Sequence, residues 1–401
     1  MAEQTMTSRE RMLAALRCQQ PDHVPMSPFI HQGPLRLEPL YWRNQFQRAE
    51  VMLEMGLDPT IDIWLPDPQP HPDVAIKTWR EQKEGKTYIT KEYHTPAGVL
   101  RQTVHESDDW CDPDHGPWQP TIFGIEHRNG FGVELFDDHN VSRRTEPWVK
   151  GPEDLDKLRY IIRPMSGWQL DEWRMDVERA LDFAHKHHLM TYVRRSIVGD
   201  AFQWFCDIPW FLMQLYDDPE FVKEFLDIFH QWQLASLDEV LQFDVDCVQY
   251  RGWYEISTYW GPRGFENFLV PIIEEETQKV HDAGPLVAFL LPEGAGVYAD
   301  ILARMSFDCL YYVDPKMLHA GNLQDLFDAI GDSKSFWGGV NAEVTLLSED
   351  PDRIDAAVKE AIEILGQNGG LILGAGLFVA ISNQSILYMI DSWRKYRDMY
   401  S

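Results

Sequence analysis

Polar side chains that could act on a substrate follow apolar segments at several points in this chain. Carboxylates stand at Asp62, Glu255 and Glu293, and a histidine stands at His31. A carboxylate or an imidazole at such a position can act as a general acid or base, or orient a substrate N–H or O–H. Two carboxylates that share a pocket raise the pKa of one of them, which provides an acid and a base together. We therefore interpret these four residues as candidate catalytic groups.

Each of these residues also has a purely structural interpretation. Asp62 is compatible with a surface turn or a helix cap, and His31 with a hydrogen-bonded loop. Glu255 and Glu293 are compatible with salt bridges to a nearby arginine such as Arg251. The residue types alone leave both interpretations open at each position.

Arginines and aromatic residues near the same segment ends are candidate substrate-binding groups. Arg194, next to Arg195, interrupts an apolar segment, which is unusual for a strand of a parallel sheet. An inward-facing arginine needs an anion, either a substrate carboxylate or an internal acid, and Arg251 raises the same question. Aromatic side chains suit a flat ring substrate, although ordinary packing is the alternative. The other candidates are Trp204, Trp253, Tyr254, Asn341, Gly374 and Ala375.

The composition excludes several classes of protein. A formal charge of −28, from 36 basic and 64 acidic residues, repels nucleic acid and anionic lipid, so we expect neither as a partner. Five scattered cysteines without a C-x-x-C pair argue against a disulfide scaffold or a local zinc knuckle. No window approaches the roughly 18 uninterrupted apolar residues of a membrane helix, and no signal-peptide pattern opens the chain. We expect a soluble cytoplasmic protein.

The elements that must position these residues alternate along the chain. Thr7 and Glu10 form a capping box that predicts a helix through Leu16. Eight apolar β segments then alternate with helical segments, which predicts a (β/α)8 TIM barrel in a single domain over residues 1–401. In such a barrel the chemistry lies at the carboxyl ends of the strands, where the candidate residues stand. A doubly wound sheet is the alternative, but no G-x-G-x-x-G follows the first strand.

Residues of approximately 66–165 interrupt this alternation and form the predicted insertion. The run "VAIKTWREQKEGKTYITKEYHTPAGVLRQTV" alternates in polarity and turns at Glu84-Gly85 and at residues 95–98. This pattern predicts an antiparallel β-ribbon after the second strand. The Pro-rich, aromatic stretch beyond it is expected to be irregular, as a lid or a contact between subunits.

Four segments resemble the uroporphyrinogen decarboxylase superfamily. They are "SRERMLAALRCQQPDHVPM" near the start, "YYVDP", "WGGVNAEVTLLSEDPDRIDAAVKEAIE", and "GGLILGAGLFVAISNQSILYMIDSW" near the end. The resemblance spans nearly the whole chain and keeps the order of elements. It implies a (β/α)8 barrel, and an activity among the porphyrinogen decarboxylases and the corrinoid-linked methyltransferases. By family analogy alone it also suggests a homodimer.

The family's functional residues are only partly present. Where the decarboxylases have an Arg-Gln-Ala-Gly run, this chain has residues 31–34, "HQGP", so the carboxylate-binding arginine is lost. Asp62 matches the aspartate that holds the pyrrole nitrogens, and Ala375 replaces the histidine of the last strand. The zinc methyltransferases have a His-x-Cys pair and a later Cys, and this chain has neither. Zinc by the usual ligand set is therefore not expected, although an arrangement using Glu255, Glu293 and His31 is left open.

Three functions follow as hypotheses. The first is methyl transfer between a small methylated substrate, such as an aryl methyl ether, and cobalamin on a corrinoid partner protein. The second is a cofactor-free decarboxylase or lyase acting on a small carboxylic acid, with Asp62 orienting the substrate and Arg251 gripping its carboxylate. The third is a non-catalytic binding barrel, favoured because Gly374-Ala375-Gly376 carries no side chain that could take part in chemistry. Its glycines suit close backbone approach to a ligand.

Overall fold

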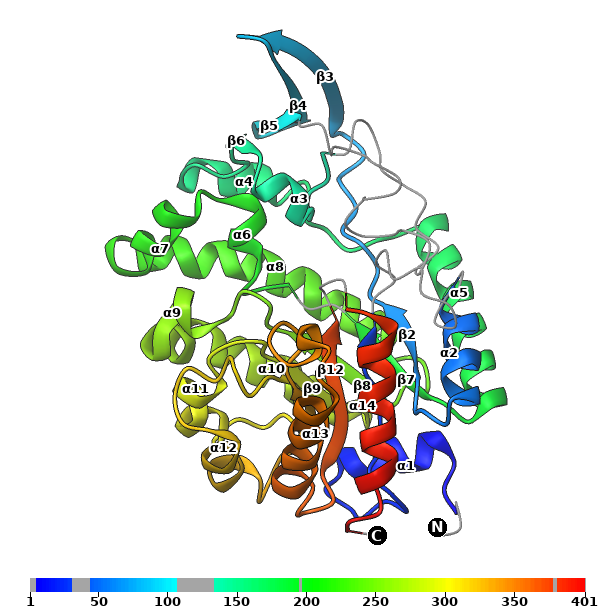
Figure 1. Cartoon of the computed structure of the whole chain (residues 1–401). Helices are drawn as coiled ribbons and strands as arrows, with labels where there is room; N and C mark the ends of the chain where they lie inside the picture. Colours follow the sequence, from blue (N-terminus) through cyan, green and yellow to red (C-terminus); the bar gives the residue numbers. More distant parts are fainter. Residues whose placement is uncertain (1–4, 31–43, 107–132, 195–196, 378–380, 401) are drawn as a thin grey trace.

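The computed structural model describes residues 5–30, 44–106, 133–194, 197–377 and 381–400 of the 401-residue chain. Two sheets organise it (Figure 1): a parallel sheet in the body of the molecule and an antiparallel sheet that projects from it. Among the described helices, none is both long enough and apolar enough to cross a membrane.

Eight parallel strands form the main sheet, in the order β1-β12-β11-β10-β9-β8-β7-β2. They are β1 (Phe29–Ile30), β2 (Thr60–Trp64), β7 (Met190–Arg194), β8 (Cys247–Arg251), β9 (Leu286–Leu290), β10 (Cys309–Val313), β11 (Ser335–Val340) and β12 (Leu371–Leu377). Each corresponds to one of the predicted apolar segments, which confirms their positions and the mixed α/β class.

Closure of this sheet into a complete barrel stays a prediction. The end strands are β1 and β2, and no strand pairing between them is found among the described residues. A single backbone hydrogen bond, from the Asp58 N–H to the Met26 carbonyl at 2.9 Å, joins the segments that lead into these two strands. Met26 also bridges to Leu373 ahead of the β1–β12 pairing. The structure therefore shows a curled parallel sheet whose ends meet at one backbone contact.

Helices connect these strands and cover the outer face of the sheet. The capping box predicted at Thr7 and Glu10 is present and begins α1 (Ser8–Leu16). The longer helices that follow are α2 (Gln45–Glu54), α5 (Trp168–His187), α8 (Pro219–Val240), α10 (Val270–Ala283), α11 (Ala295–Leu302), α12 (Leu323–Ile330), α13 (Pro351–Leu365) and α14 (Asn383–Tyr396).

The helical segment that follows β7 consists of two consecutive helices. It is divided into α7 (Ile208–Asp217) and α8, because Asp218 leaves the helical conformation and caps α8 while Pro219 occupies its first turn. Before it lies the short α6 (Ala201–Phe205). Likewise, α10 is preceded by α9 (Ser257–Gly264), which kinks at Gly261, and by a π-helical turn over Phe265–Leu269.

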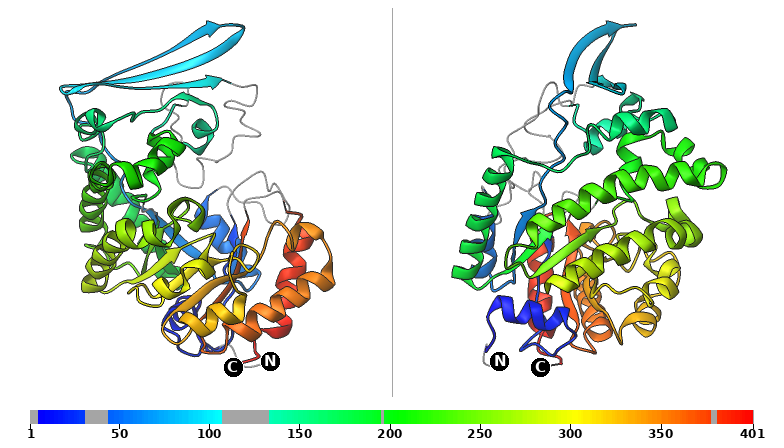
Figure 2. Two further views of the ribbon diagram at one scale, coloured as in Figure 1. Left: turned by 90° about the vertical axis from the view of Figure 1, so that its left-hand side faces the viewer. Right: turned by 180° about the vertical axis from the view of Figure 1, so that it is seen from behind.

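The antiparallel ribbon predicted after β2 is confirmed. Strands β3 (Ala75–Lys83), β4 (Lys86–Thr95), β5 (Gly98–Glu106) and β6 (Arg144–Glu146) pair in that order. Glu84 and Gly85 both have positive φ, as a two-residue hairpin turn requires. The views of Figure 2 show this sheet extending away from the parallel sheet. Two short helices, α3 (Asp138–Val141) and α4 (Leu155–Leu158), lead the chain back.

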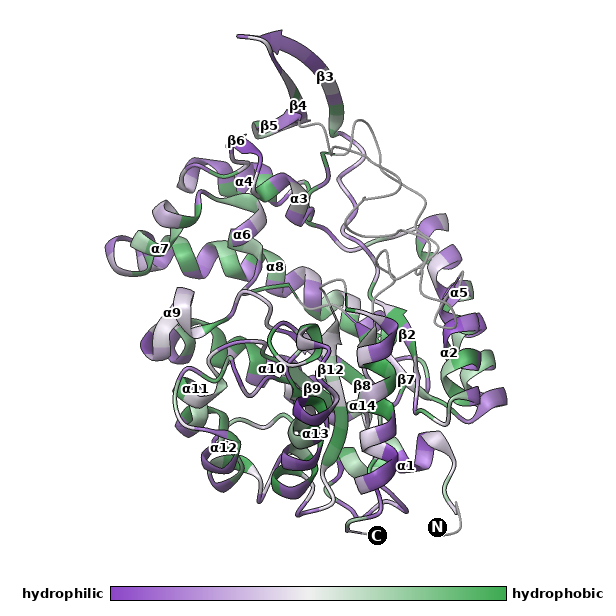
Figure 3. Ribbon diagram, in the orientation of Figure 1, coloured by the Kyte–Doolittle hydropathy of each residue, from purple (hydrophilic) through white to green (hydrophobic). Residues whose placement is uncertain are grey.

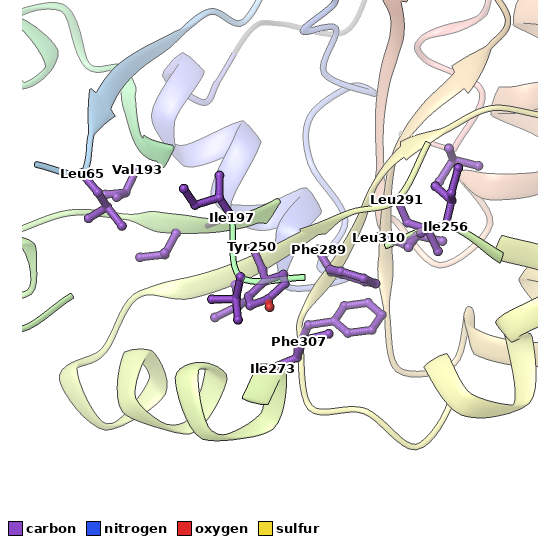
Figure 4. Close-up of a cluster of buried hydrophobic side chains, with 14 of the residues drawn as sticks. Leu65, Val193, Ile197, Tyr250, Ile256, Ile273, Phe289, Leu291, Phe307 and Leu310 are labelled. Atoms are coloured by element: carbon purple, nitrogen blue, oxygen red, sulfur yellow. The ribbon is translucent and has the colours of Figure 1, made fainter. Parts of the chain in front are cut away.

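The core lies on both faces of the parallel sheet, because alternate side chains of each strand point to opposite faces. Figure 3 shows the strands and the helix faces toward them as mainly hydrophobic, with polar residues outside. Outward-facing residues such as Val193, Tyr250 and Phe289 pack against the helices (Figure 4). Inward-facing residues such as Tyr192, Leu290 and Trp337 form a second cluster with the apolar side of α1. Candidate residues on the inner face must therefore lie closer to the carboxyl ends of the strands than this second cluster.

Candidate active site

Asp62 lies on the inner face of β2 inside a network of buried charges. Its Oδ2 is 3.1 Å from Nη2 of Arg48 and 3.0 Å from Nε of Arg194, and its Oδ1 accepts a hydrogen bond from the Thr60 hydroxyl at 3.1 Å. Burial alone would raise the pKa of Asp62, but Arg194 and Arg48 outweigh it and lower that pKa. Asp62 is therefore an ionised carboxylate with both oxygens occupied.

Arg194 continues this network to the neighbouring strand, as the internal interpretation of that arginine expects. It points inward from β7, where its Nη1 lies 3.4 Å from the Gln249 carboxamide oxygen on β8. The guanidinium also lies 5.0 Å from the Tyr192 ring. Tyr311, from β10, contacts Trp337 and Tyr192 at ring distances of 4.7 and 5.8 Å. These residues form a polar layer with an aromatic base inside the sheet.

A second cluster stands further along the strands, around Asp200. Asp200 follows β7 and is fully buried, and its Oδ1 accepts a hydrogen bond from the Tyr254 N–H at 2.7 Å. Its Oδ2 has no hydrogen-bond partner among the described residues and lies 3.9 Å from Nε of Arg251. Burial raises the pKa of Asp200 to about 7, although Arg251 opposes the shift. Asp200 can therefore hold a proton near neutral pH.

Glu255 lies beside Asp200 and is also fully buried. Its Oε1 accepts a hydrogen bond from the Gly199 N–H at 2.9 Å and one from the Tyr250 hydroxyl at 3.3 Å. Its Oε2 has no hydrogen-bond partner among the described residues. Burial raises the pKa of Glu255 well above its ordinary value, and the nearby carboxyl of Asp200 raises it further. Burial and the neighbouring Asp200 carboxyl group therefore both favour the protonated form of Glu255.

The insertion contributes a residue to this cluster. Asp138 of α3 accepts hydrogen bonds through Oδ1 from the Trp204 indole at 2.7 Å and from the Tyr254 hydroxyl at 3.1 Å. The rings of Trp204 and Tyr254 lie 5.7 Å apart in an edge-to-face arrangement. Three of the residues predicted from the sequence, Trp204, Trp253 and Tyr254, thus gather around Arg251.

Glu293 lies apart from these clusters. It accepts a hydrogen bond from the Thr258 hydroxyl and lies 3.5 Å from Nδ1 of His319. Among the described residues, no hydrogen bond or ion pair joins Glu293 to Asp62 or to Glu255. The structure therefore distributes the three predicted carboxylates over separate sets of contacts, and their catalytic roles stay predictions.

The last strand borders a small hollow at the carboxyl ends of β10, β11 and β12. Its lining includes Asp314, Tyr312, Gly374 and Ala375. Asn341, another predicted residue, lies next to it and donates a hydrogen bond to the Asp314 carboxylate at 2.8 Å. Substrate binding by these residues stays a prediction.

The glycines of this strand already have close neighbours within the protein. A Cβ on Gly376 would collide with the Tyr312 hydroxyl, and one on Gly374 would lie 2.9 Å from the Ser27 carbonyl oxygen. The side chain of Ala375 belongs with Leu373 to the core cluster on the helix side of the sheet. The groups that the glycines approach most closely are therefore the protein's own Tyr312 and Ser27.

Some relevant residues escaped the sequence analysis, and two residues named there lie outside the described part of the chain. His31 and Arg195 lie outside the described residues. Asp200 stands at a predicted strand end, but nothing in the sequence distinguishes it from other acids. Arg48 and Asp138 come from α2 and from the insertion, and no local pattern relates them to the inner face of the sheet.

Comparisons with known proteins show which family and which solved structures this chain is similar to. Residues 206–396 match the family model for uroporphyrinogen decarboxylase (URO-D). A methyltransferase from Methanosarcina mazei superposes with a TM-score of 0.56 over 98% of this chain and 99% of its own, at 15% identity, so the two share a fold. The carboxyl-terminal part of the chain is therefore similar to the uroporphyrinogen decarboxylase family, and the whole chain shares its fold with this methyltransferase.

Another solved structure aligns with a smaller part of this chain and at a lower TM-score. A B12-independent methionine synthase from Shewanella sp. W3-18-1 aligns over 60% of this chain and 68% of its own, at 11% identity and a TM-score of 0.39. No curated protein matches the sequence.

The zinc site of the superfamily's methyltransferases does not fit the residues described. Strand β9 carries Leu286–Leu290 without His or Cys, and no group of three or more His, Cys, Asp or Glu side chains within the described ranges is arranged to hold a metal ion. Cys247 and Cys309 are buried at strand starts, where burial raises the pKa of both thiols. They are core residues of the inner cluster.

Proposed function

We propose that this protein transfers a methyl group from a small methylated substrate, such as an aryl methyl ether, to cobalamin on a corrinoid protein. The similarity to the uroporphyrinogen decarboxylase family and the shared fold with a protein named as a methyltransferase support this activity. The observation that carries it is the proton-holding pair Asp200 and Glu255 beside aromatic side chains at the strand ends.

Demethylation of an ether needs a proton donor. When the methyl group leaves, the O–CH3 bond breaks and its electron pair stays on the oxygen, which must then be protonated. A reduced corrinoid supplies the nucleophile that accepts the methyl group. In this proposal Asp200, whose Oδ2 has no hydrogen-bond partner among the described residues, gives its proton to the departing oxygen.

The aromatic residues position the flat partners of this reaction. Trp253 and Tyr254 are partly exposed at the strand ends, where their ring faces suit a substrate ring or a corrin face. Asp138 orients Trp204 and Tyr254 by accepting a hydrogen bond from each. Because the usual zinc ligands are not present at these positions, we assign no step to zinc.

This proposal is tested by supplying reduced cobalamin with a panel of methyl ethers, methylamines and methyl thiols. We expect a corrinoid absorbance change with at least one aryl ether. Because Asp200 donates in its protonated form, kcat/KM should fall about tenfold for each pH unit above about 7. Asp200→Asn should lower the rate by about 10²- to 10⁴-fold.

Asp182→Asn, at an exposed position of α5, is the matched control and should retain the wild-type rate and pH profile. Absence of methyl transfer from every donor in the panel contradicts the proposal. A pH profile that is flat between 6 and 9 removes Asp200 as the donor.

Decarboxylation of a small carboxylic acid is the second candidate, favoured by Arg251. Its guanidinium makes no hydrogen bond to any described residue and is partly exposed at the strand ends. CO2 release that persists with chelator and without corrinoid, and that is lost in Arg251→Gln, would favour this activity over methyl transfer. We further propose, from the family resemblance, that the sheet closes as a barrel and that the protein is a cytoplasmic homodimer.

A further inference from the structure

Arg251, at the carboxyl end of β8, has one long ion pair and no hydrogen bond among the described residues. Its side chain is 20% exposed, and its nearest acid is Asp200, at 3.9 Å between Nε and Oδ2. Neither of these two atoms has a hydrogen-bond partner among the described residues. The guanidinium lies 5.7 Å from the ring of Trp204 and 5.7 Å from the ring of Trp253. A half-buried group with five N–H donors and no acceptor requires a ligand or water to complete it.

The charges beneath Arg251 make this place favourable for an anion. Gln249 is the preceding inward-facing residue of β8, about 7 Å lower by the rise of a strand, and Arg194 contacts it there. Arg194 and Arg48 both contact the carboxylate of Asp62, so two arginines lie close together in this part of the inner face. In a chain of formal charge −28, such a concentration of arginines draws anions locally.

The chemistry around Arg251 selects among anions. A planar guanidinium binds a carboxylate through two parallel hydrogen bonds, and flanking indole rings favour an aromatic ligand. Asp200, Asp138 and Glu255 stand close by, so a dianion such as phosphate meets more repulsion than a monoanion once Asp200 ionises. These contacts together favour an aromatic monocarboxylate.

The separation of Arg251 and Asp200 adds a geometric condition. A carboxylate held by Arg251 lies within a few ångströms of the unpartnered Oδ2 of Asp200. An oxygen that receives its proton from Asp200 must also lie within a few ångströms of this Oδ2 atom. In a benzene ring, only neighbouring substituents bring two oxygen-bearing groups that close together.

We infer that Arg251 binds the carboxylate of an aromatic acid whose reacting oxygen is on the adjacent ring carbon, as in 2-methoxybenzoate. The role of that oxygen rests on the proposed function, whereas the binding of the carboxylate does not. The probes are therefore 2-methoxybenzoate, its neutral analogue 2-methoxybenzamide, and the isomer 4-methoxybenzoate.

Binding is measured by titration calorimetry of the full chain at pH 6.5, without corrinoid. Wild type should bind 2-methoxybenzoate at least about tenfold more tightly than either other compound, because only this ligand meets Arg251 and Asp200 together. Arg251→Gln should weaken its binding by about 10- to 100-fold and leave the binding of 2-methoxybenzamide almost unchanged. Arg251→Lys should fall between the two, because it keeps the charge but loses the paired donors.

Arg263→Gln, at an exposed position of α9, is the matched control and should bind like wild type. Equal melting temperatures of the variants show that each is folded. Equal binding of the acid and the amide, unchanged binding in Arg251→Gln, or no saturable binding of either benzoate overturns the inference. Equal binding of 2-methoxybenzoate and 4-methoxybenzoate would show that the oxygen need not be on the ring carbon next to the one that carries the carboxylate. Intact binding without methyl transfer contradicts the proposed function and leaves the carboxylate site standing.

Discussion

At the scale of the residue, burial decides what each carboxyl group can do. Asp62 lies within β2, Asp200 follows β7, and both are buried. Asp62 has two arginines at about hydrogen-bond distance, which hold it ionised. Asp200 has one arginine at 3.9 Å, too far to offset its burial, and keeps its proton to about pH 7. The same residue type therefore serves as a fixed counter-charge in one place and as an acid in the other.

The counter-charge role of Asp62 predicts a large loss of stability on its removal. Asp62→Asn leaves Arg48 and Arg194 buried without their anion, and we expect the free energy of unfolding to fall by about 3–5 kcal/mol. Urea denaturation at pH 7 measures it. Because the pKa of Asp62 is lowered on folding, its contribution is present above its ordinary value of 3.8 and is lost as the pH falls below it.

Asp171→Asn, at an exposed ion pair with Arg174, is the control and should have a nearly unchanged midpoint. If Asp62→Asn unfolds like wild type but loses activity, Asp62 contacts the substrate, as the family resemblance implies.

At the scale of the element, β10 and β12 fit together through a tyrosine and a glycine. Tyr312 has a positive φ of 69°, at the register shift between β10 and β11. Its ring also packs edge-to-face on Trp253, at 5.1 Å between centroids. Its hydroxyl occupies the space above Gly376. The glycine-rich end of β12 is thus shaped by the side chain of a strand two places away in the sheet.

Substitution of Gly376 tests this fit. Gly376→Ala should destabilise the protein by about 1–3 kcal/mol, because its methyl group meets the Tyr312 ring. In a Tyr312→Ala background most of that cost should disappear, giving a coupling energy of about 1 kcal/mol or more in a double-mutant cycle of urea unfolding.

Gly374→Ala is the matched control, because its methyl group meets the Ser27 backbone carbonyl, which Tyr312→Ala does not remove. Equal costs of Gly376→Ala in both backgrounds would show that Tyr312 does not limit this position.

At the scale of the whole molecule, the insertion is tied to the parallel sheet close to the candidate site. Arg144 of β6 donates hydrogen bonds to the carbonyls of Gln203 and Trp204, at 3.0 and 2.9 Å, and to that of Cys206. These carbonyls end α6, whose Trp204 borders Arg251. Asp138 of the insertion reaches the same tryptophan. The insertion therefore supports one wall of the site.

This attachment predicts a joint effect of Arg144 on stability and on the site. Arg144→Met removes the donors for three carbonyls, and we expect a loss of about 2–4 kcal/mol in unfolding free energy. It should also weaken the binding of 2-methoxybenzoate, because Trp204 is no longer held beside Arg251. Arg80→Met, on the exposed strand β3, removes a surface ion pair and should change neither. Unchanged ligand binding in a destabilised Arg144→Met would show that the insertion does not shape the site.

Local features could be predicted because neighbouring residues decide them. Thr7 and Glu10 cap each other across three positions, and Glu84-Gly85 turns a hairpin through its own backbone angles. The apolar strand segments could be located because each must bury side chains on two faces. The division between α7 and α8 is also local, because Asp218 caps α8 and Pro219 occupies its first turn.

The amino-acid sequence by itself determined the order of strands and helices, the hairpin, the family likeness and the residues that reach the strand ends. Only the tertiary structure decided which of them meet. Asp138 and Trp204 are 66 positions apart, and Arg48 reaches Asp62 from a helix. Charge states followed from these meetings, because a buried carboxyl group titrates according to the cations and donors that the fold brings to it. That is why Asp62 and Asp200, alike in the sequence, differ in the folded protein.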